Sequence, residues 1–545
     1  MRSAGCVGFV CSVLSIWVSA VRAVEPHAVQ SIARQIDQLV SRRLAAEGLP
    51  PSPLSSDSVF VRRAFLTLTG RIPTVQDTVG FLDDAAADKR LKLIDRLLAS
   101  PSYGEHFANH WHRLLTGREF GMARPPDTRL LATWLAEEFN ANRPWNELAT
   151  RILLAEGTHG KQPATIFFTL HGNSRGIPEP NVIATTAGKL FLGLDLECAE
   201  CHDHPFRNWS QQEFWSLAAF FSRVQDSGNK GGTKRWIKET PLEPGQAPAL
   251  AIPESSFTNV GMKVAARLPD PVKTELDGRS SLRSVYAAWM TSDENPFFAR
   301  NLANRIWAHC FGRGLMNPLD GFRRDPNRTV TAQDDQSRRA QVTHPELLQL
   351  LATEFVAAGF DQKHLLRCIC SSKTWQRGSE PLAQNQHDLE LYSHRTPTVM
   401  TAEVLLDSLT VAWGDALLSD QRPKMDFRNP LLPLYSPREE FLHLFRTLPK
   451  DADQTKYTQG IPQLLFLMNS PELNSEPPLV DQLVRVQTDV ASAVEQLYLA
   501  ALARRPSREE LSDALDFIQG QQTPRDGLVG VFWTLFNRSE FMINH

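Results

Sequence analysis

The sequence has few cysteines, nearly balanced charge and no long apolar run. Seven cysteines in 545 residues are too few for a disulfide framework to hold the fold. Lysine and arginine number 58 and aspartate and glutamate 61, which gives a formal net charge of −3. Such a chain has no net field to attract a phosphate backbone, so nucleic acid is not an expected partner.

Three common catalytic patterns are also missing from the sequence. There is no Gly-x-Ser-x-Gly turn for a nucleophilic serine, no glycine-rich phosphate loop with its lysine, and no His-Glu-x-x-His pair for zinc. The sequence therefore offers no support for a hydrolase or a kinase.

The first residues, MRSAGCVGFVCSVLSIWVSAVRAVEP, have the layout of a secretory signal. Arg2 supplies the positive charge, and an uncharged apolar run extends from Gly5 to Val21. We expect cleavage after Ala23, so that residues 1–23 are removed. The run is shorter than the ~20 residues of a membrane-spanning helix. The mature chain is therefore predicted to have no stable membrane span and to be periplasmic, secreted or attached to the cell envelope.

The composition, with 42% apolar and 22% charged residues, is that of a folded protein. Apolar residues recur at three- and four-residue steps through most of the chain, which predicts a mainly α-helical fold. Glycine and proline interrupt this pattern between the two halves. We predict a helical domain over 28–225, a linker over 226–281 with a small β-hairpin around 235–267, and a second helical domain over 282–545.

Two helix starts have the pattern of a capping box. In Ser210-Gln211-Gln212-Glu213 the serine hydroxyl and the glutamate carboxylate are expected to bond the first free amides of a helix. Thr343-His344-Pro345-Glu346 predicts the same arrangement at a later helix.

Residues 198–205 read CAECHDHP, which contains the pattern of a c-type haem attachment site. Two thiols one turn apart can each add to a vinyl group of one porphyrin. The next residue then presents an imidazole to the iron. This interpretation makes Cys198 and Cys201 the attachment points for haem c and His202 the proximal ligand. It also agrees with the predicted signal, because this haem is attached after export.

Two other interpretations of the motif stay open. Cys198, Cys201, His202 and His204 together suit a zinc or iron ion, with a fifth candidate ligand from a distant part of the chain. The two cysteines could equally form a disulfide or an inert pair.

Several residues outside the Cys-x-x-Cys-His motif are candidates for the remaining coordination positions of a haem iron or a metal ion. His309, His344, His110 and Met316 are candidates for a sixth haem ligand or a further metal ligand, although each has an ordinary structural role as its simpler explanation. Asp203 is expected to accept a hydrogen bond from His202 or His204 and to tune the basicity of that imidazole.

Several long stretches resemble a known pair of domains. GKLFLGLDLECAECHDHPFRNWSQQEFWSLAAFFSRV is similar to the second type of the cytochrome-like "PSCyt" domain of secreted planctomycete proteins. NPFFARNLANRIWAHCFGRGLMNPLDGFR and THPELLQLLATEFVAAGFDQKHLLRCICSSKTWQ are similar to the planctomycete "PSD" domain that usually follows it. The resemblance implies that the stretch from Cys198 to His204, together with His110, Trp307, His309 and His344, corresponds to family motifs. The family itself has no assigned function.

These observations predict an exported protein with a c-type haem site that acts in envelope electron transfer or in a haem-dependent oxidoreductase step. Its redox or envelope partner is not specified by the sequence. The alternative is a non-enzymatic envelope scaffold or binding protein, in which the same cluster holds a metal ion or a disulfide.

Overall fold

The structure is a computed structural model. It describes residues 26–116, 126–205, 208–226, 235–241, 248–269, 281–322, 342–414, 418, 436–445, 461–470, 477–486 and 489–545. The predicted signal, residues 1–23, lies outside the described residues.

The described part of the chain is mainly helical, which confirms the predicted fold class. The N-terminal half contains α1 (Pro26–Ala46), α2 (Asp57–Thr69), α3 (Val75–Leu82), α4 (Lys89–Ala99), α5 (Pro101–Thr116), α6 (Arg129–Asn140), α7 (Trp145–Leu153), α8 (Ile166–Leu170), α9 (Pro180–Ala187) and α10 (Gln211–Ala218). Short 3-10 and π turns lie among them: η1 (Pro163–Thr165), η2 (Gly188–Leu192), η3 (Glu197–Glu200) and η4 (Ala219–Phe221).

Helices also dominate the C-terminal half. They are α11 (Leu282–Met290), α12 (Phe298–Phe311), α13 (Pro345–Ala357), α14 (Gln362–Ser371), α15 (Lys373–Gln376), α16 (Ala402–Trp413), α17 (Pro437–Phe445), α18 (Ile461–Asn469), α19 (Pro478–Arg485), α20 (Val490–Leu502), α21 (Arg508–Gln519), α22 (Pro524–Phe536) and α23 (Ser539–Met542). No helix in the described ranges is both long and apolar enough to cross a membrane.

The strands are short and form three small antiparallel sheets. β1 (Gly157–Thr158) and β2 (Val224–Asp226) flank β3 (Trp236–Glu239), β4 (Ala249–Ala251) pairs with β5 (Lys263–Ala265), and β6 (Thr398–Val399) pairs with β7 (Ile543–Asn544). The β4–β5 pair is the small hairpin predicted between the two halves.

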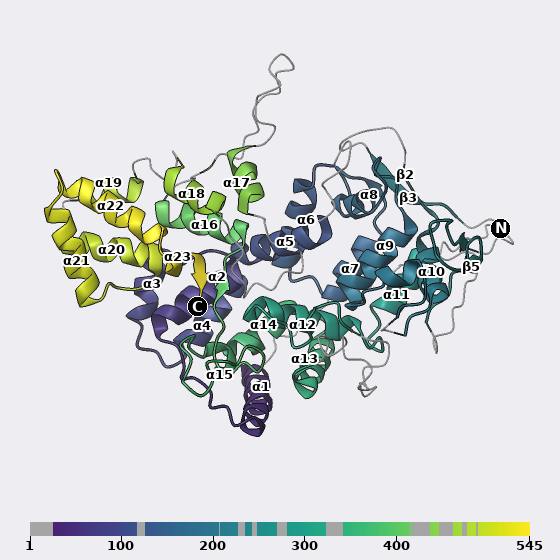
Figure 1. Cartoon of the computed structure of the whole chain (residues 1–545), viewed down its shortest axis with the longest axis horizontal. Coiled ribbons are helices and arrows are strands. Elements are labelled where there is room, and N and C mark those ends of the chain that lie inside the picture. The colour runs from purple at the N-terminus through teal and green to yellow at the C-terminus, as the bar shows by residue number, and fades with distance from the viewer. Residues whose placement is uncertain are drawn as a thin grey trace, which may run out of the picture.

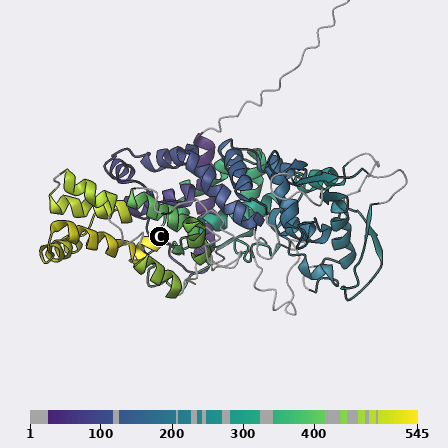
Figure 2. The same cartoon turned by 90° about the horizontal axis from the view of Figure 1, so that it is seen from above.

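The molecule is elongated, and the helices from α19 to α22 lie at the end opposite to α10 and β5 (Figure 1; Figure 2). Its apolar residues form two cores. The first extends in sequence from Val29 to Tyr392 and so combines residues from both sides of the predicted linker. The second contains residues from Met400 to Met542 together with Leu66 and Ile72 from the N-terminal half. The domain boundaries stay a prediction, but the two halves are packed together throughout.

Two buried arginines on α2 connect the cores. Arg62 donates hydrogen bonds to the carbonyls of Ala501, at 2.9 Å, and Phe541, at 2.6 Å. Arg63 donates to the carbonyls of Trp375 at 2.6 Å, Arg377 at 2.9 Å and His545 at 2.5 Å. Burial lowers the pKa of Arg62 to about 10 and that of Arg63 well below its usual value.

The two predicted capping boxes have different outcomes. The box at Ser210 is confirmed, because both the serine and the Glu213 carboxylate make the expected bonds. The prediction at Thr343 is wrong. His344 is the residue that precedes the helix, Pro345 opens it, and the Glu346 carboxylate instead pairs with Arg42 at 2.9 Å.

Replacement of Arg63 by methionine should destabilise the protein strongly. Methionine fills much of the same volume but removes the donor to three backbone oxygens, two of them in buried bonds, which costs about 3 kcal/mol of unfolding free energy. Chemical denaturation followed by circular dichroism measures the loss. Arg34, which is exposed on α1, supplies the control Arg34→Met, which should change the unfolding free energy by about 0.5 kcal/mol or less. Equal midpoints for the two variants would contradict the anchoring role.

Candidate functional site

The Cys-x-x-Cys-His motif lies on η3 and on the loop that follows it into α10. Cys198 is exposed and Cys201 is half-buried, and both are thiols. The base of the loop is fixed by a bridge between Leu194 and Gly321, which brings it against the segment after α12. The two sulfur atoms are therefore held on a folded base but stay accessible to reagents in solution.

Gln211, the first residue of α10, organises this loop from the inside. Its side chain is fully buried. The amide nitrogen Nε2 donates to the carbonyls of Glu200, at 3.3 Å, and Cys201, at 3.1 Å. The oxygen Oε1 accepts hydrogen bonds from Thr258 and Asn259, both at 2.9 Å. Gln211 thus ties the motif to the tip of the β4–β5 hairpin.

The hairpin tip also touches the motif directly. The backbone amide of Phe257 donates to the carbonyl of Cys201 at 3.1 Å. The Phe257 ring is stacked near the His202 imidazole, with ring centroids 6.2 Å apart, and the phenylalanine is 79% exposed. A large apolar side chain therefore stands uncovered beside the motif histidine.

The imidazole of His202 is oriented by the next residue. Its Nδ1 lies 2.7 Å from the backbone carbonyl of Asp203, which can only accept, so Nδ1 carries the proton. The lone pair is then on Nε2, the atom with which histidine commonly binds a metal. The Asp203 carboxylate is used differently, because its Oδ1 accepts from the backbone amide of Gln211 at 2.8 Å. The backbone carbonyl, rather than the carboxylate, orients the imidazole.

His204 is more buried than His202. The residue is buried, and its backbone amide donates to the carbonyl of Trp209 at 2.7 Å. Across the described residues, three ligand atoms from His, Cys, Asp or Glu lie within 4.8 Å of one another at Glu354, His364 and Cys368, and not at the motif. The four motif residues proposed for a metal ion are therefore not gathered around one point.

His344 and Met316 are both buried near the segment that follows α12. The Nδ1 atom of His344 is 3.0 Å from the Thr343 hydroxyl, and its buried Nε2 has no hydrogen-bond partner. Burial lowers the pKa of His344 to about 4. The backbone of Met316 is held by the Asn304 side chain through bonds of 2.8 and 2.9 Å.

His110 and His309 are brought together, but away from the motif. His110 on α5 and His309 on α12 have ring centroids 5.2 Å apart, and His106 on α5 lies at the same distance from His309. Figure 1 shows α5 near the middle of the molecule, whereas α10 is near the end that carries the strands. The sequence analysis missed His106, although its four-residue spacing from His110 is the pattern that places both rings on one helix face.

Family models match most of the described chain. The PSCyt2 model, described as a protein of unknown function (DUF1549), matches residues 35–226. The PSD1 model, described as a protein of unknown function (DUF1553), matches residues 282–518. The chain belongs to the PSCyt2–PSD1 family. No curated protein and no solved structure matches it.

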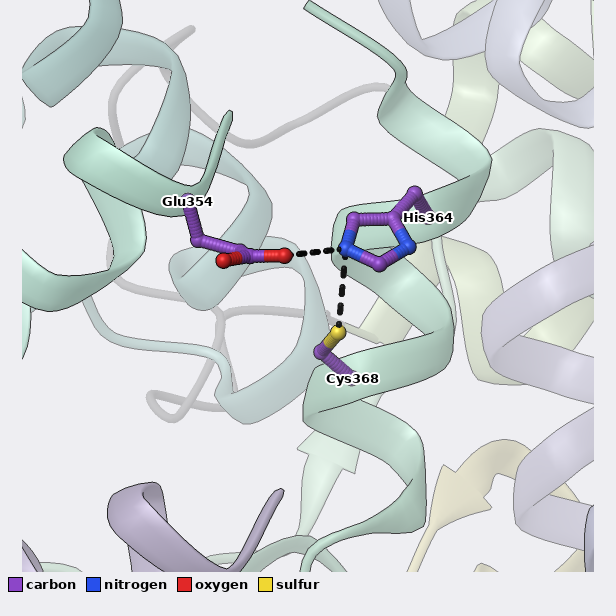
Figure 3. A group of neighbouring side chains, drawn as sticks. All are labelled: Glu354, His364 and Cys368. Carbon is purple, nitrogen blue, oxygen red and sulfur yellow. Dashed lines mark hydrogen bonds and ion pairs between the residues drawn. The ribbon is translucent and has the colours of Figure 1, made fainter. Parts of the chain in front are cut away.

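This PSCyt2–PSD1 protein also contains a group of three neighbouring side chains, Glu354, His364 and Cys368 (Figure 3). The sequence analysis did not predict this group. The Nε2 atom of His364 lies 2.6 Å from the Glu354 carboxylate and 3.6 Å from the Cys368 sulfur. Burial raises the pKa of the Cys368 thiol to about 12. The three side chains connect the end of α13 to α14, and these hydrogen bonds account for their arrangement.

Replacement of Gln211 by alanine should loosen the motif loop. Four hydrogen bonds to the Cys201 region and to the hairpin tip are lost, so Cys201 should react faster with an alkylating reagent. The change should also lower the unfolding free energy by about 2–3 kcal/mol. Mass spectrometry of the labelled peptide gives the rate for each thiol. Gln212 is the next residue and is exposed, so Gln212→Ala should leave the rate unchanged. A Cys201 rate that does not respond to Gln211→Ala would contradict this role.

The protein should lose stability as the pH falls from about 6.5 to 4. Burial lowers the pKa of His159, His309 and His344 to about 4 in the folded state, whereas unfolded histidine titrates near ~6.5. The unfolded state therefore binds more protons in this window, at a cost of about 2 kcal/mol per histidine at pH 5.

Denaturant unfolding at pH 7 and pH 5 tests this, and His344→Gln should lose about 2 kcal/mol less than the wild type between the two pH values. The exposed His387 provides the control, because His387→Gln should leave the pH dependence unchanged. The same loss in the wild type and in His344→Gln would mean that His344 is not the titrating group.

Proposed function

We propose that this protein is a c-type haem protein of the cell envelope. In this proposal Cys198 and Cys201 hold the porphyrin through two thioether bonds, and His202 is the proximal ligand through Nε2. The bound haem would supply one-electron oxidation and reduction at its iron, for envelope electron transfer or for a haem-dependent oxidoreductase step.

The observation that carries the proposal is the hydrogen bond between Nδ1 of His202 and the carbonyl of Asp203. It fixes the tautomer with a lone pair on Nε2 and stops the ring from rotating freely. A backbone carbonyl on Nδ1 is a common partner of a metal-binding imidazole, and it also raises the basicity of the ligand atom.

The accessibility of the two thiols fits covalent attachment. Cys198 is exposed and Cys201 is half-buried, so both sulfur atoms can react with a group that approaches from outside. A structural metal core or a structural disulfide is more commonly enclosed by the protein. Cys198, Cys201 and His202 also lie on one short turn and the residues directly after it. Attachment to a single porphyrin requires this closeness.

The apolar hairpin tip fits a porphyrin edge. Phe257, Val260 and Met262 are all exposed on the hairpin segment that follows β4, and Phe257 stands beside His202. Exposed apolar groups of this size are uncommon in a cluster on a protein surface and usually mark a binding site. A bound macrocycle would cover part of this apolar surface.

The scaffold alternative is supported less well. It requires the motif to gather a metal ion or to close a disulfide, and the ligand atoms of Cys198, Cys201, His202 and His204 are not gathered within the described structure. The experiment below distinguishes this alternative, because an envelope protein that binds a partner without redox chemistry would be colourless.

An absorption spectrum of the protein, purified from a host that matures c-type cytochromes, tests the proposal. We expect a sharp band after reduction and haem that stays attached during denaturing electrophoresis. The double variant Cys198→Ala, Cys201→Ala should lose the covalent haem. His202→Ala should keep it but change the spectrum, because the iron loses its proximal ligand.

Cys368→Ala serves as the matched control, since it removes a thiol outside the motif and should leave haem attachment unchanged. A folded but colourless wild-type protein would rule out the haem. Metal analysis and a thiol count on that sample would then separate the metal ion from the disulfide.

A further inference from the structure

A second polar site lies in the middle of the molecule, where the parts matched by the two family models meet. A cavity of about 60 Å³ is lined by Thr67 on α2, by His106, His110 and Arg113 on α5, by His309 on α12 and by Glu403 on α16. α2 and α5 belong to the PSCyt2 match, whereas α12 and α16 belong to the PSD1 match. The cavity has room for an ion and a few water molecules.

The three imidazoles form one contiguous group. His106 and His110 are four residues apart on α5 and so project from the same face of that helix. The His309 ring lies 5.2 Å, centroid to centroid, from each of them. Burial lowers the pKa of all three imidazoles, to about 4 for His309 and well below the usual value for His106 and His110. All three rings are therefore neutral at pH 7, and a neutral imidazole is the form that binds metal ions.

The lone pair of His309 can be assigned to one atom, and a nitrogen of His106 lacks a hydrogen-bond partner. Nε2 of His309 lies 2.8 Å from the carbonyl of Thr67, so Nε2 carries the proton and Nδ1 carries the lone pair. Nε2 of His106 is buried and has no hydrogen-bond partner. A buried nitrogen without a partner costs free energy, and an ion bound at this position would remove that cost.

The ring separations match metal coordination. Two imidazoles bound to one tetrahedral ion at about 2.0 Å have ring centroids roughly 5 Å apart, and both neighbouring pairs here have that separation. We propose that the cavity binds a divalent transition-metal ion through His106, His110 and His309. The ligand atoms do not all lie within 4.8 Å of one another, so binding requires at least one ring to rotate.

The lining also contains two charged residues, Glu403 and Arg113, which have opposite effects on a bound cation. The carboxylate of Glu403 favours a bound cation. The guanidinium of Arg113 opposes it, and is placed to hold an anionic group that completes the coordination of the ion. The site is thus suited to an ion with three imidazole ligands and an exchangeable anion or water. This proposal does not depend on a haem at Cys198 and Cys201.

Cobalt substitution tests the site in the full mature chain. The protein is treated with a chelator, titrated with Co²⁺ and then challenged with Zn²⁺. We expect one equivalent of Co²⁺ to bind and to give visible d–d absorption, without sulfur-to-metal charge transfer because the ligands are imidazoles. His309→Ala and His110→Gln should each weaken binding about tenfold or more, and Zn²⁺ should displace the cobalt.

Three controls separate this site from the other candidates. His344→Ala removes a buried imidazole elsewhere and should not change cobalt binding. The Cys198→Ser, Cys201→Ser variant and the Cys368→Ala variant should also retain it. Loss of the cobalt signal in either cysteine variant would place the ion at the motif or beside Glu354, and would overturn the proposal.

The absence of stoichiometric binding to the folded wild type would overturn it as well. Circular dichroism shows whether each variant is folded. His110→Gln keeps a polar side chain of similar size, so it tests the same ligand if His309→Ala does not fold.

Discussion

The arrangement of the molecule depends on the two arginines buried on α2. A guanidinium keeps its charge inside a protein, and these two donate to backbone oxygens. Six backbone oxygens must therefore converge on α2, from the end of α15, the end of α20 and the last residues of the chain. The same convergence builds the cavity. Thr67 lies one turn after Arg63, and Asn544 immediately precedes the residue that Arg63 holds, and both line the cavity.

The motif loop is held in a different way, through bonds to its backbone, while Cys198 is exposed and Cys201 and His202 are half-buried. The carbonyls of Glu200 and Cys201 accept hydrogen bonds from Gln211, from Trp215 and from the hairpin. The backbone cannot rearrange without the loss of several of these bonds. The thiols and the His202 imidazole are thus presented by a rigid frame, which is what preorganised ligation requires.

Sequence reasoning located the helices well because their signals are local. The mainly helical fold follows from the three- and four-residue apolar spacing, and the Ser210 capping box is formed as expected. The Thr343 pattern failed because the helix starts one residue later, with His344 before it and Pro345 at its first position, so Glu346 does not lie where a capping box needs it. Asp203 was expected to accept from His202 or His204 through its carboxylate, whereas its backbone carbonyl accepts from His202. The grouping of His106, His110 and His309 was not predicted. No local pattern shows which nitrogen carries a proton, or which rings from different helices will meet.

Helix α12 provides a physical connection between the two sites. Its residues Asn301, Arg305 and His309 are spaced by four and therefore lie along one stripe of the helix. Asn301 donates to the carbonyl of Leu190 at 2.7 Å, and Arg305 donates to that of Lys189 at 2.8 Å, so this stripe holds η2, which leads into the motif loop. His309 ends the same stripe in the central cavity. Any shift of α12 that accompanies ligation of His309 would act on η2 through these two hydrogen bonds, of which the one from Asn301 is buried and the one from Arg305 is partly buried. The motif and the cavity thus differ in chemistry but are both connected to helix α12. The connection to the motif loop consists of hydrogen bonds from Asn301 and Arg305 to backbone carbonyls of η2.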